Sequence, residues 1–320
     1  MSAYKRFVSY LYEYDNRKKG KNRGFVRVEV RNHQCCLELH MTLPACPFVP
    51  VFRAYAFIAR PGALHGLFRV RCFTQDDAHI FMTEEQIKDE ISGVISLIDG
   101  VYKLFGFKYH IELSTRPEDS MGSDEAWEIA TAGLQNALDE NGINYTINEG
   151  DGAFYGPKID FHLEDSIGRT WQCGTIQLDM QMPERFELEY TAADGTKKRP
   201  VMIHRVCFGS IERFIGILIE HFAGQFPVWL SPVQVKVLPI SEKFADYAKS
   251  VEDALDAAGI RVETDNRAEK IGYKIREARN ERVPYIIVVG EKDQEANMVS
   301  LRSRKNGEEG QVALADFIAR

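Results

Sequence analysis

One strand-like run, residues 69–81, holds an unusual concentration of chemically active side chains. Arginines, an amide, two adjacent carboxylates and an imidazole follow one another within it. Side chains alternate between the two faces of a strand, so every second residue of an extended run lies on the same side. We therefore predict a ligand-binding face on this strand. That face would carry Arg69, Arg71, Phe73, Gln75, Asp77 and His79.

The elements predicted after this run are helices and a group of antiparallel strands. Thr83 and Gln86 have the spacing of a capping box, and an apolar stripe follows at helical spacing until Gly106, which is well placed to end the helix. A second helix is expected over about 123–141, and another begins at 209–210. The apolar stripe is formed by Ile87, Ile91, Val94, Ile98, Val101 and Phe105. Strands are predicted near residues 158–163, 171–178, 186–190 and 200–206.

Composition narrows the class of protein. The chain has 320 residues, of which 44% are hydrophobic and 27% charged, which is enough for two or three domains with their own cores. The longest apolar runs, such as 285–289, are too short to span a bilayer, so we expect a cytoplasmic protein without a membrane segment. The six cysteines lack the spacing of a disulfide framework and are predicted to be reduced thiols. The net charge of -7 excludes a nonspecific nucleic-acid coat protein but permits a tRNA binder with a local basic face.

The register of residues 69–81 resembles motif 2 of the class II aminoacyl-tRNA synthetases. The preceding run Gly-Ala-Leu-His-Gly-Leu-Phe, residues 62–68, makes the resemblance specific to the threonyl-tRNA synthetases. The resemblance continues from about residue 61 to residue 320. Further matching segments are Phe154–Lys158, Gln172–Gln177, Val201–Arg205 and Gly209–Phe214, the last of which is similar to motif 3.

The resemblance implies an α/β (α+β) chain of three parts. Residues 61–231 would form a partial class II catalytic domain, an antiparallel β-sheet core with flanking helices. Residues 232–320, in which strands and helices alternate at short spacing, would form the small α/β anticodon-binding domain. Residues 1–60 do not share the resemblance, and their alternating runs predict a small N-terminal β-meander.

His79 and His204 are the candidate metal ligands. Spacing alone leaves them open as metal ligands or as hydrogen-bonded structural histidines. In the family, two histidines at these positions and one cysteine from an earlier motif hold Zn²⁺, whose open positions bind the amino and hydroxyl groups of threonine. A site that demands a hydroxyl rejects the isosteric valine more strongly than an apolar pocket would. The Asn-Cys-Pro-Gly-His segment that supplies the cysteine is missing here, and Cys46 is the one nearby substitute.

The substrate-binding residues follow from the same resemblance. Asp77 would accept a hydrogen bond from the hydroxyl group of threonine, and other polar residues would orient the amino acid. Considered singly, each of them is more often a surface or packing residue than a ligand. The threonine-binding set is Gln75, Asp77, Tyr155, Gln172 and Gln177.

The ATP-binding residues are a second set. Adenylate formation requires the triphosphate charge to be neutralised and the phosphate aligned, a task suited to the guanidinium groups of Arg69 and Arg213. Phe73 would stack on adenine, or else be a core aromatic, and Lys158 would contact phosphate or the tRNA end, or else be a solvated lysine. Mg²⁺ would accompany the ATP. The catalytic set is Arg69, Arg213 and Lys158, and the ATP-binding set is Arg69, Phe73, Gln172, Ser210 and Arg213.

The last domain carries the candidate RNA-binding residues. A helix from about residue 269 is rich in basic side chains, which either face RNA phosphates or are simply solvated. Asp293 and Arg302 match positions that read anticodon bases in the family. The basic residues of the helix are Lys270, Lys274, Arg276, Arg279 and Arg282.

Departures from the family pattern lead to the functional hypotheses. Residues 55–60 stand where the family has the motif 2 Arg-x-Glu, with Arg53 and Arg60 as nearby arginines, and motif 1, which forms the family's homodimer, is absent. The first hypothesis is a threonine–tRNA ligase acting on ATP, threonine and tRNA-Thr, with impaired activity. The alternatives are a noncatalytic module that binds the tRNA anticodon, and a reading frame formed by joining unrelated genes near Arg60.

Overall fold

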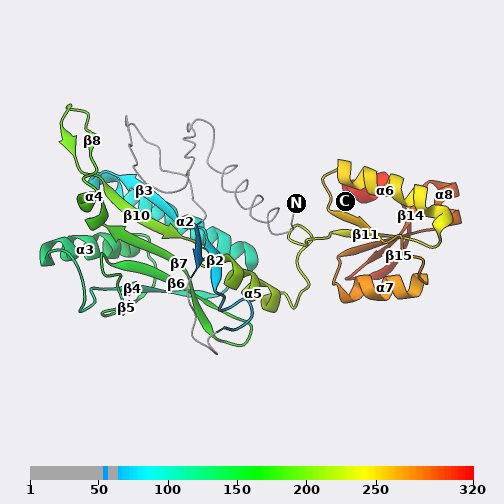
Figure 1. Cartoon of the computed structure of the whole chain (residues 1–320), viewed down its shortest axis with the longest axis horizontal. Coiled ribbons are helices and arrows are strands. Elements are labelled where there is room, and N and C mark those ends of the chain that lie inside the picture. The colour runs from blue at the N-terminus through cyan, green and yellow to red at the C-terminus, as the bar shows by residue number, and fades with distance from the viewer. Residues whose placement is uncertain (1–52, 57–63) are drawn as a thin grey trace. The chain divides into compact units, whose positions relative to one another are not determined.

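The computed structural model describes residues 53–56 and 64–320, which belong to two compact units. The core unit comprises the described residues up to Leu218, and the C-terminal unit comprises residues 219–320 (Figure 1). The predicted N-terminal meander, Cys46 and Arg60 lie outside the described residues. In the part of the chain that is described, no helix has both the length and the apolar character needed to cross a membrane.

The core unit is built on a six-stranded sheet in the order β3-β10-β7-β6-β4-β5. Neighbouring strands are antiparallel except β4 and β5, which are parallel. In β6, the apolar Ile159 and Phe161 alternate with the polar Lys158 and Asp160, so the sheet has one apolar and one polar face. The strands are β3 (Ala78–Met82), β4 (Tyr109–Ser114), β5 (Thr146–Asn148), β6 (Lys158–Glu164), β7 (Thr170–Asp179) and β10 (Val201–Val206).

Two long helices, α2 (Ile87–Phe105) and α3 (Asp124–Glu140), cover the apolar face (Figure 1). The predicted capping box is confirmed at the short helix η1 (Glu84–Gln86) that leads into α2, and Gly106 ends α2 with φ +74°. The apolar stripe is buried from Ile91 onward because it packs on the sheet, where the rings of Tyr102 and Phe161 lie 6.3 Å apart. The Ser123 side chain caps α3 by accepting the amide of Ala126.

The predicted strand at 186–190 is wrong. The Asp179 carboxylate accepts the amides of Gln181 and Met182, which starts the short helix α4 (Gln181–Arg185) instead. Phe186 is therefore exposed, and a small hairpin of β8 (Tyr190–Thr191) and β9 (Lys197–Lys198) follows. The alternation of apolar and polar residues at 186–190 therefore does not form a strand of the central sheet.

The predicted single strand over 69–81 is also wrong, because the run is divided between two sheets. β2 (Cys72–Gln75) pairs with β1 (Arg53–Ala56) in a two-stranded sheet, whereas β3 belongs to the central sheet. Asp76 and Asp77, both buried, lie between β2 and β3. The Asp76 carboxylate accepts amides of the segment after β10, which holds the chain at this break.

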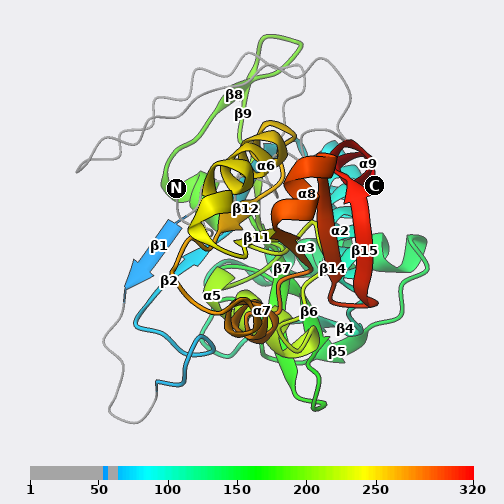
Figure 2. The same cartoon turned by 90° about the vertical axis from the view of Figure 1, so that its right-hand side faces the viewer.

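The C-terminal unit contains a five-stranded sheet in the order β12-β11-β13-β14-β15. β12, β11 and β13 are parallel to one another, β14 is antiparallel to β13, and β15 is antiparallel to β14. Helix α5 (Ile211–His221) leads out of the core unit, and α6 (Ala245–Ala257) and α7 (Ile271–Asn280) lie on opposite faces of this sheet (Figure 2). The remaining elements are β11 (Val235–Pro239), η2 (Glu242–Phe244), β12 (Val262–Thr264), β13 (Tyr285–Val289), α8 (Glu291–Ala296), β14 (Met298–Ser303), β15 (Gly307–Ala313) and α9 (Leu314–Ala319).

The two inner parallel strands of the C-terminal unit, β11 and β13, are buried on both faces. Val235, Val237 and Ile287 belong to the apolar cluster beside α6, while Leu238 and Ile286 belong to the one beside α7. Parallel strands covered by helices on both sides need such continuous apolar runs. The run at 285–289 is therefore an internal strand.

Candidate functional site

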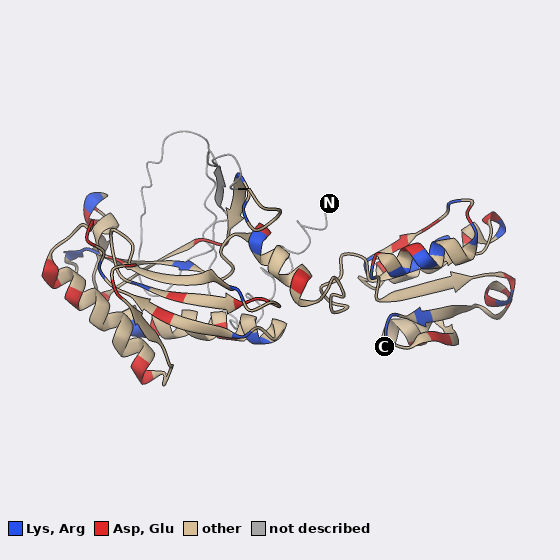
Figure 3. Ribbon diagram, turned by 90° about the horizontal axis from the view of Figure 1, so that it is seen from below, with Lys and Arg blue, Asp and Glu red and all other residues tan. Residues whose placement is uncertain are grey.

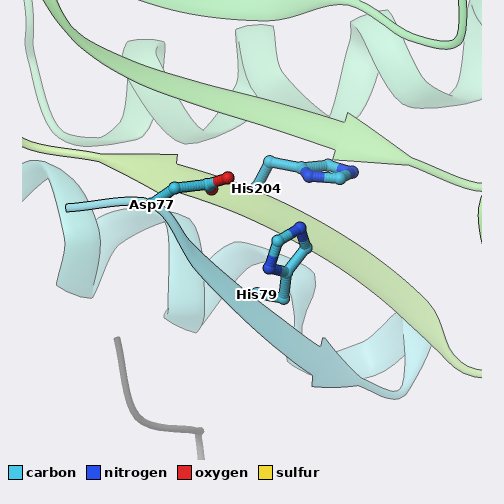
Figure 4. A group of neighbouring side chains, drawn as sticks. All are labelled: Asp77, His79 and His204. Atoms are coloured by element: carbon cyan, nitrogen blue, oxygen red, sulfur yellow. The ribbon is translucent and has the colours of Figure 1, made fainter. Parts of the chain in front are cut away.

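The polar face of the core sheet brings three possible metal ligands together. One ligand atom each from Asp77, His79 and His204 lie within 4.8 Å of one another. His79 on β3 and His204 on β10 are register partners, and their ring centroids are 4.5 Å apart. Asp77 enters from the segment just before β3 (Figure 4). Two imidazoles and a carboxylate are a donor set that suits Zn²⁺ with a position left open.

A buried carboxylate orients one of these histidines. Asp179 Oδ2 lies 2.8 Å from Nε2 of His204, and Asp179 is completely buried at the end of β7. Its other oxygen accepts the amides of Gln181 and Met182, which fixes the carboxylate. Carboxylates in this position set the tautomer and direction of a metal-binding imidazole. This hydrogen bond uses Nε2 of His204, so the other ring nitrogen, Nδ1, is left to bind a ligand.

Tyr155 and Gln177 lie beside the same cluster. The Tyr155 ring is 5.2 Å from that of His204, and its hydroxyl donates a hydrogen bond to Oε1 of Gln177. Gln177 is the register partner of both His204 and Lys158. Gly156 lets the Tyr155 segment approach the sheet, since a Cβ there would come within 2.0 Å of the carbonyl oxygen of Leu178.

Lys158 and Gln172 form a second polar group around Asp160. Lys158 Nζ is 2.9 Å from Asp160 and 3.1 Å from Asp151, and Gln172 Nε2 donates to Asp160 at 2.6 Å. Ser114 completes the group with a 2.8 Å bond to the same carboxylate. Burial acts to lower the pKa of Lys158, but the two carboxylates outweigh it and raise that pKa. Lys158 is thus held as a cation on the polar face.

Arg213 lies in the first turn of α5. Its Nε–H donates to the carbonyl oxygen of Phe68 at 3.2 Å, and its guanidinium lies 5.4 Å from the ring centroid of Trp171. Ser210 Oγ accepts the amide of Arg213 at 3.3 Å. A cation in this turn opposes the helix dipole, and these contacts offset that cost.

Other predicted residues are less clearly joined to the cluster. Arg69 is exposed, Phe73 and Gln75 on β2 are half-buried, and Gln75 forms an isolated backbone bridge with Ser210. The motif segments therefore meet at Ser210, but the side chain of Arg69 extends into solvent. Sequence reasoning missed Asp76, Asp160, Asp179, Trp171 and Glu212. For the four carboxylates the signal in the sequence was their position beside motif residues, and Trp171 likewise directly precedes the motif residue Gln172.

In the C-terminal unit, Asp293 and Arg302 both have partners within the unit. Asp293 is buried and accepts the amide of Gly290, the hydroxyl of Ser300 and the side-chain amide of Gln311. Arg302 pairs with Glu308 at 2.6 Å. A base contact by either residue would compete with these bonds.

The basic residues of α7 are divided in the structure. Lys274 is 3% exposed, and its Nζ donates to the carbonyl oxygens of Pro239 and Asp265. Its predicted place on an RNA-binding face is wrong, because it faces the sheet. Arg276 and Arg279 are exposed, and Figure 3 marks the basic residues of this unit.

Comparisons with known proteins agree with these two units. Residues 41–222 match the class II core domain of the tRNA synthetases for Gly, His, Pro, Ser and Thr, and residues 234–320 match an anticodon-binding domain. The class II match begins at residue 41 and so reaches into residues 1–60, which the motifs alone left outside the resemblance.

The similar proteins include threonine–tRNA ligases and a threonyl-tRNA synthetase structure. The chain is 71% identical over 259 residues to a threonine–tRNA ligase of Acetivibrio thermocellus, covering 81% of this chain and 41% of that protein. It is 70% identical to a threonine–tRNA ligase of Clostridium tetani, a match that covers 81% of this chain and 40% of that protein. A crystal structure described as the RNA-binding domain of threonyl-tRNA synthetase from Cryptosporidium parvum superposes with a TM-score of 0.81 at 43% identity, over 85% of this chain and 69% of that one. The chain thus spans about two fifths of the length of these curated relatives.

A mostly antiparallel sheet with one polar face, followed by an anticodon-binding domain, defines a class II aminoacyl-tRNA synthetase architecture, and the predicted fold class is confirmed. Within that class, the chain belongs to the threonyl-tRNA synthetase family.

Proposed function

We propose that this chain is a threonine–tRNA ligase that joins threonine to ATP as threonyl-adenylate and transfers the amino acid to tRNA-Thr. The observation that supports it most is the convergence of Asp77, His79 and His204 on the polar face of the sheet. This is the set expected for an amino acid recognised by its hydroxyl group. High identity to threonine–tRNA ligases supports the same substrate.

Asp77, His79 and His204 would hold Zn²⁺, which when bound supplies positive charge and open positions for the amino and hydroxyl groups of threonine. In this proposal Asp77 binds the substrate hydroxyl directly or shares in holding the metal. The carboxylate is adjacent to both imidazoles, so either arrangement excludes valine by leaving polar groups unpaired. Cys46 lies outside the described residues. Where Asp77 binds the substrate hydroxyl, the two histidines are the protein ligands that the described residues supply.

The remaining site residues have separate roles in the proposal. Tyr155 and Gln177 restrict each other's rotation and orient the amino group and carboxylate of threonine. Lys158, kept cationic by Asp160, is available to the α-phosphate after exchange of its bond with the exposed Asp151. Arg213 neutralises charge on the triphosphate with its accompanying Mg²⁺. Gln172 holds Asp160, and through it Lys158.

We expect the rate of adenylate formation to be reduced. The family's Arg-x-Glu of motif 2 is replaced by Tyr-Ala-Phe-Ile-Ala-Arg in residues 55–60. β1 nevertheless provides a strand opposite β2, with Arg53 as the register partner of Gln75. Loss of one phosphate-binding guanidinium costs on the order of 10² to 10³ in kcat by analogy with other lost charge-stabilising donors.

Threonine-dependent exchange of pyrophosphate into ATP tests the proposal. The purified chain is assayed with Zn²⁺ and Mg²⁺, with threonine as substrate and valine as the control amino acid. Exchange with threonine alone supports a ligase. Folded protein that shows no exchange but binds tRNA in a salt-sensitive manner supports the noncatalytic tRNA-binding module instead.

A further inference from the structure

Two acidic side chains connect the motif 2 segment to the motif 3 segment, and neither belongs to the predicted site. Asp76, 3% exposed, accepts the amide of Cys207 on Oδ2 at 2.8 Å and the amide of Phe208 on Oδ1 at 3.0 Å. Glu212 makes the converse connection, since its two carboxylate oxygens lie 3.2 and 3.0 Å from the amide nitrogen of Thr74. Each segment thus contributes one carboxylate that binds the backbone of the other.

Two further contacts support this pair. The backbones of Gln75 and Ser210 form an antiparallel bridge between the two carboxylates along the chain, and Ser210 Oγ donates to Glu212 at 3.1 Å. Arg205 Nη1 lies 3.8 Å from Asp76 Oδ2 and partly compensates the buried charge. Three backbone amides and one backbone bridge thus connect the two segments.

The position of these contacts relates them to the site. Asp76 directly precedes Asp77, and Cys207 follows the strand that carries His204. Glu212 directly precedes Arg213. A strand advances about 3.3 Å per residue, so the contacts lie within about 10 Å of the metal-binding and phosphate-binding side chains along the chain.

We propose that Asp76 and Glu212 are positioning residues: by binding each other's segments, they hold Asp77 and His79 in register with His204, and Arg213 in place for the triphosphate. We call this pair the carboxylate clamp. The inference rests on the proposed function for the identity of the ligands. The clamp touches no substrate and acts through the residues beside it.

Asp76→Asn is the first test, because it keeps the shape of the side chain but turns one acceptor into a donor facing an amide. Co²⁺ is titrated into the metal-free full-length chain, and its absorption spectrum reports both the affinity and the ligand geometry. We expect Asp76→Asn to weaken Co²⁺ binding by about 10-fold, the usual effect of losing a residue that orients ligands, and to change the spectrum. Asp265→Asn is the matched control, a buried carboxylate of the C-terminal unit that should leave Co²⁺ binding unchanged.

Glu212 offers a second test with a conservative variant. Glu212→Gln retains an oxygen for the amide of Thr74, whereas Glu212→Ala removes the connection. With ATP as the titrated ligand, we expect Glu212→Ala to weaken binding by about 10-fold and Glu212→Gln to stay within about threefold of the unmodified chain, measured at a temperature where circular dichroism shows all variants folded. A residue that only supports the fold would not separate Gln from Ala in ATP affinity.

The outcomes distinguish the clamp from the proposed function. Unmodified chain that binds no Co²⁺ overturns the proposed metal site, and the clamp is then decided by ATP binding alone. Folded Asp76→Asn with unchanged Co²⁺ affinity and spectrum overturns the role of Asp76. Equal ATP affinity in Glu212→Ala and Glu212→Gln overturns the role of Glu212.

Discussion

At the scale of single residues, the site depends on a register between strands that are distant in sequence. His79 and His204 become Cα partners because β3 and β10 pair antiparallel, and Asp179 at the end of the next strand fixes the imidazole of His204. Side chains opposite each other on neighbouring strands have Cβ atoms about 5 Å apart, so they can share one metal ion. A slip of one residue would move His204 to the other face of the sheet.

His79→Ala and His204→Ala are each expected to remove Zn²⁺ binding, because each deletes one of the three donors in the cluster. Zinc content of the dialysed protein, measured by mass spectrometry, reports the result. His110→Ala is the control, an exposed histidine on β4 outside the cluster. Stoichiometric zinc in either cluster variant would contradict the assignment of that histidine.

At the scale of elements, the central sheet is held to the segment before β6 by a close backbone approach. The Tyr155 side chain reaches His204 only because residue 156 has no Cβ. A contact between distant segments also explains why the motif 2 run is not one strand. The buried carboxylate of Asp76 finds its donors on the segment after β10, so the chain leaves one sheet and enters another.

Gly156→Ala is expected to lower the free energy of unfolding by about 1–3 kcal/mol, since the added Cβ would meet a backbone oxygen that cannot move alone. Urea denaturation measures the change. Gly133→Ala in α3 is the matched control, where the nearest atoms are 3.9 Å from the new Cβ. There alanine should stabilise the helix by up to about 1 kcal/mol, so equal destabilisation by both variants would refute the steric explanation.

The loop between β12 and α7 should lose stability in acid. The hydrogen bond from Arg267, although burial opposes it, holds the pKa of Asp265 at about 2. Because the folded pKa lies below the ordinary value, this stabilisation is complete above about pH 4 and is lost as the pH falls towards 2. We expect a loss of about 1–2 kcal/mol, discounted for the exposed arginine.

Hydrogen exchange of peptides from 262–280 in the full chain, compared at pH 4 and pH 2.5 after correction for the intrinsic rate, measures this effect. Asp265→Asn removes the titrating group and should remove most of the difference. A pH dependence that persists in the variant would place its source in another group.

At the scale of the whole molecule, a net charge of -7 does not describe the local surface of the anticodon-binding domain. Affinity for nucleic acid depends on local cations that release counterions, and α7 presents Arg276 and Arg279 to solvent. Lys274 is in the same helix but is buried by the sheet. The total charge therefore understates the cations available for contact, whereas the sequence of the helix overstates them.

On the hypothesis that α7 faces RNA phosphates, replacing Arg276 and Arg279 with Gln should weaken tRNA binding and reduce the slope of log affinity against log salt by about 1–2. Lys274→Met should leave the slope unchanged but lower the stability of the C-terminal unit by about 1–3 kcal/mol, because two buried carbonyl oxygens lose their donor. Filter binding over a series of salt concentrations measures the slopes. Equal slopes in the arginine variant and the unmodified chain would exclude α7 as the contact surface.

The sequence by itself determined the family, the α/β class, both long helices and most of the strands, because helical periodicity, capping residues and contiguous motifs are local properties. His79, His204, Asp77, Tyr155 and Gln177 could be predicted from motifs, and the structure places them together.

Only the tertiary structure decided where the motif 2 run breaks, that the lysine of α7 is buried, and that Asp76, Asp179 and Glu212 support the site. These features depend on hydrogen bonds and packing between segments far apart in the chain. An isolated carboxylate in a sequence is compatible with solvent, a salt bridge or a buried bond, and only its neighbours in space select one of them.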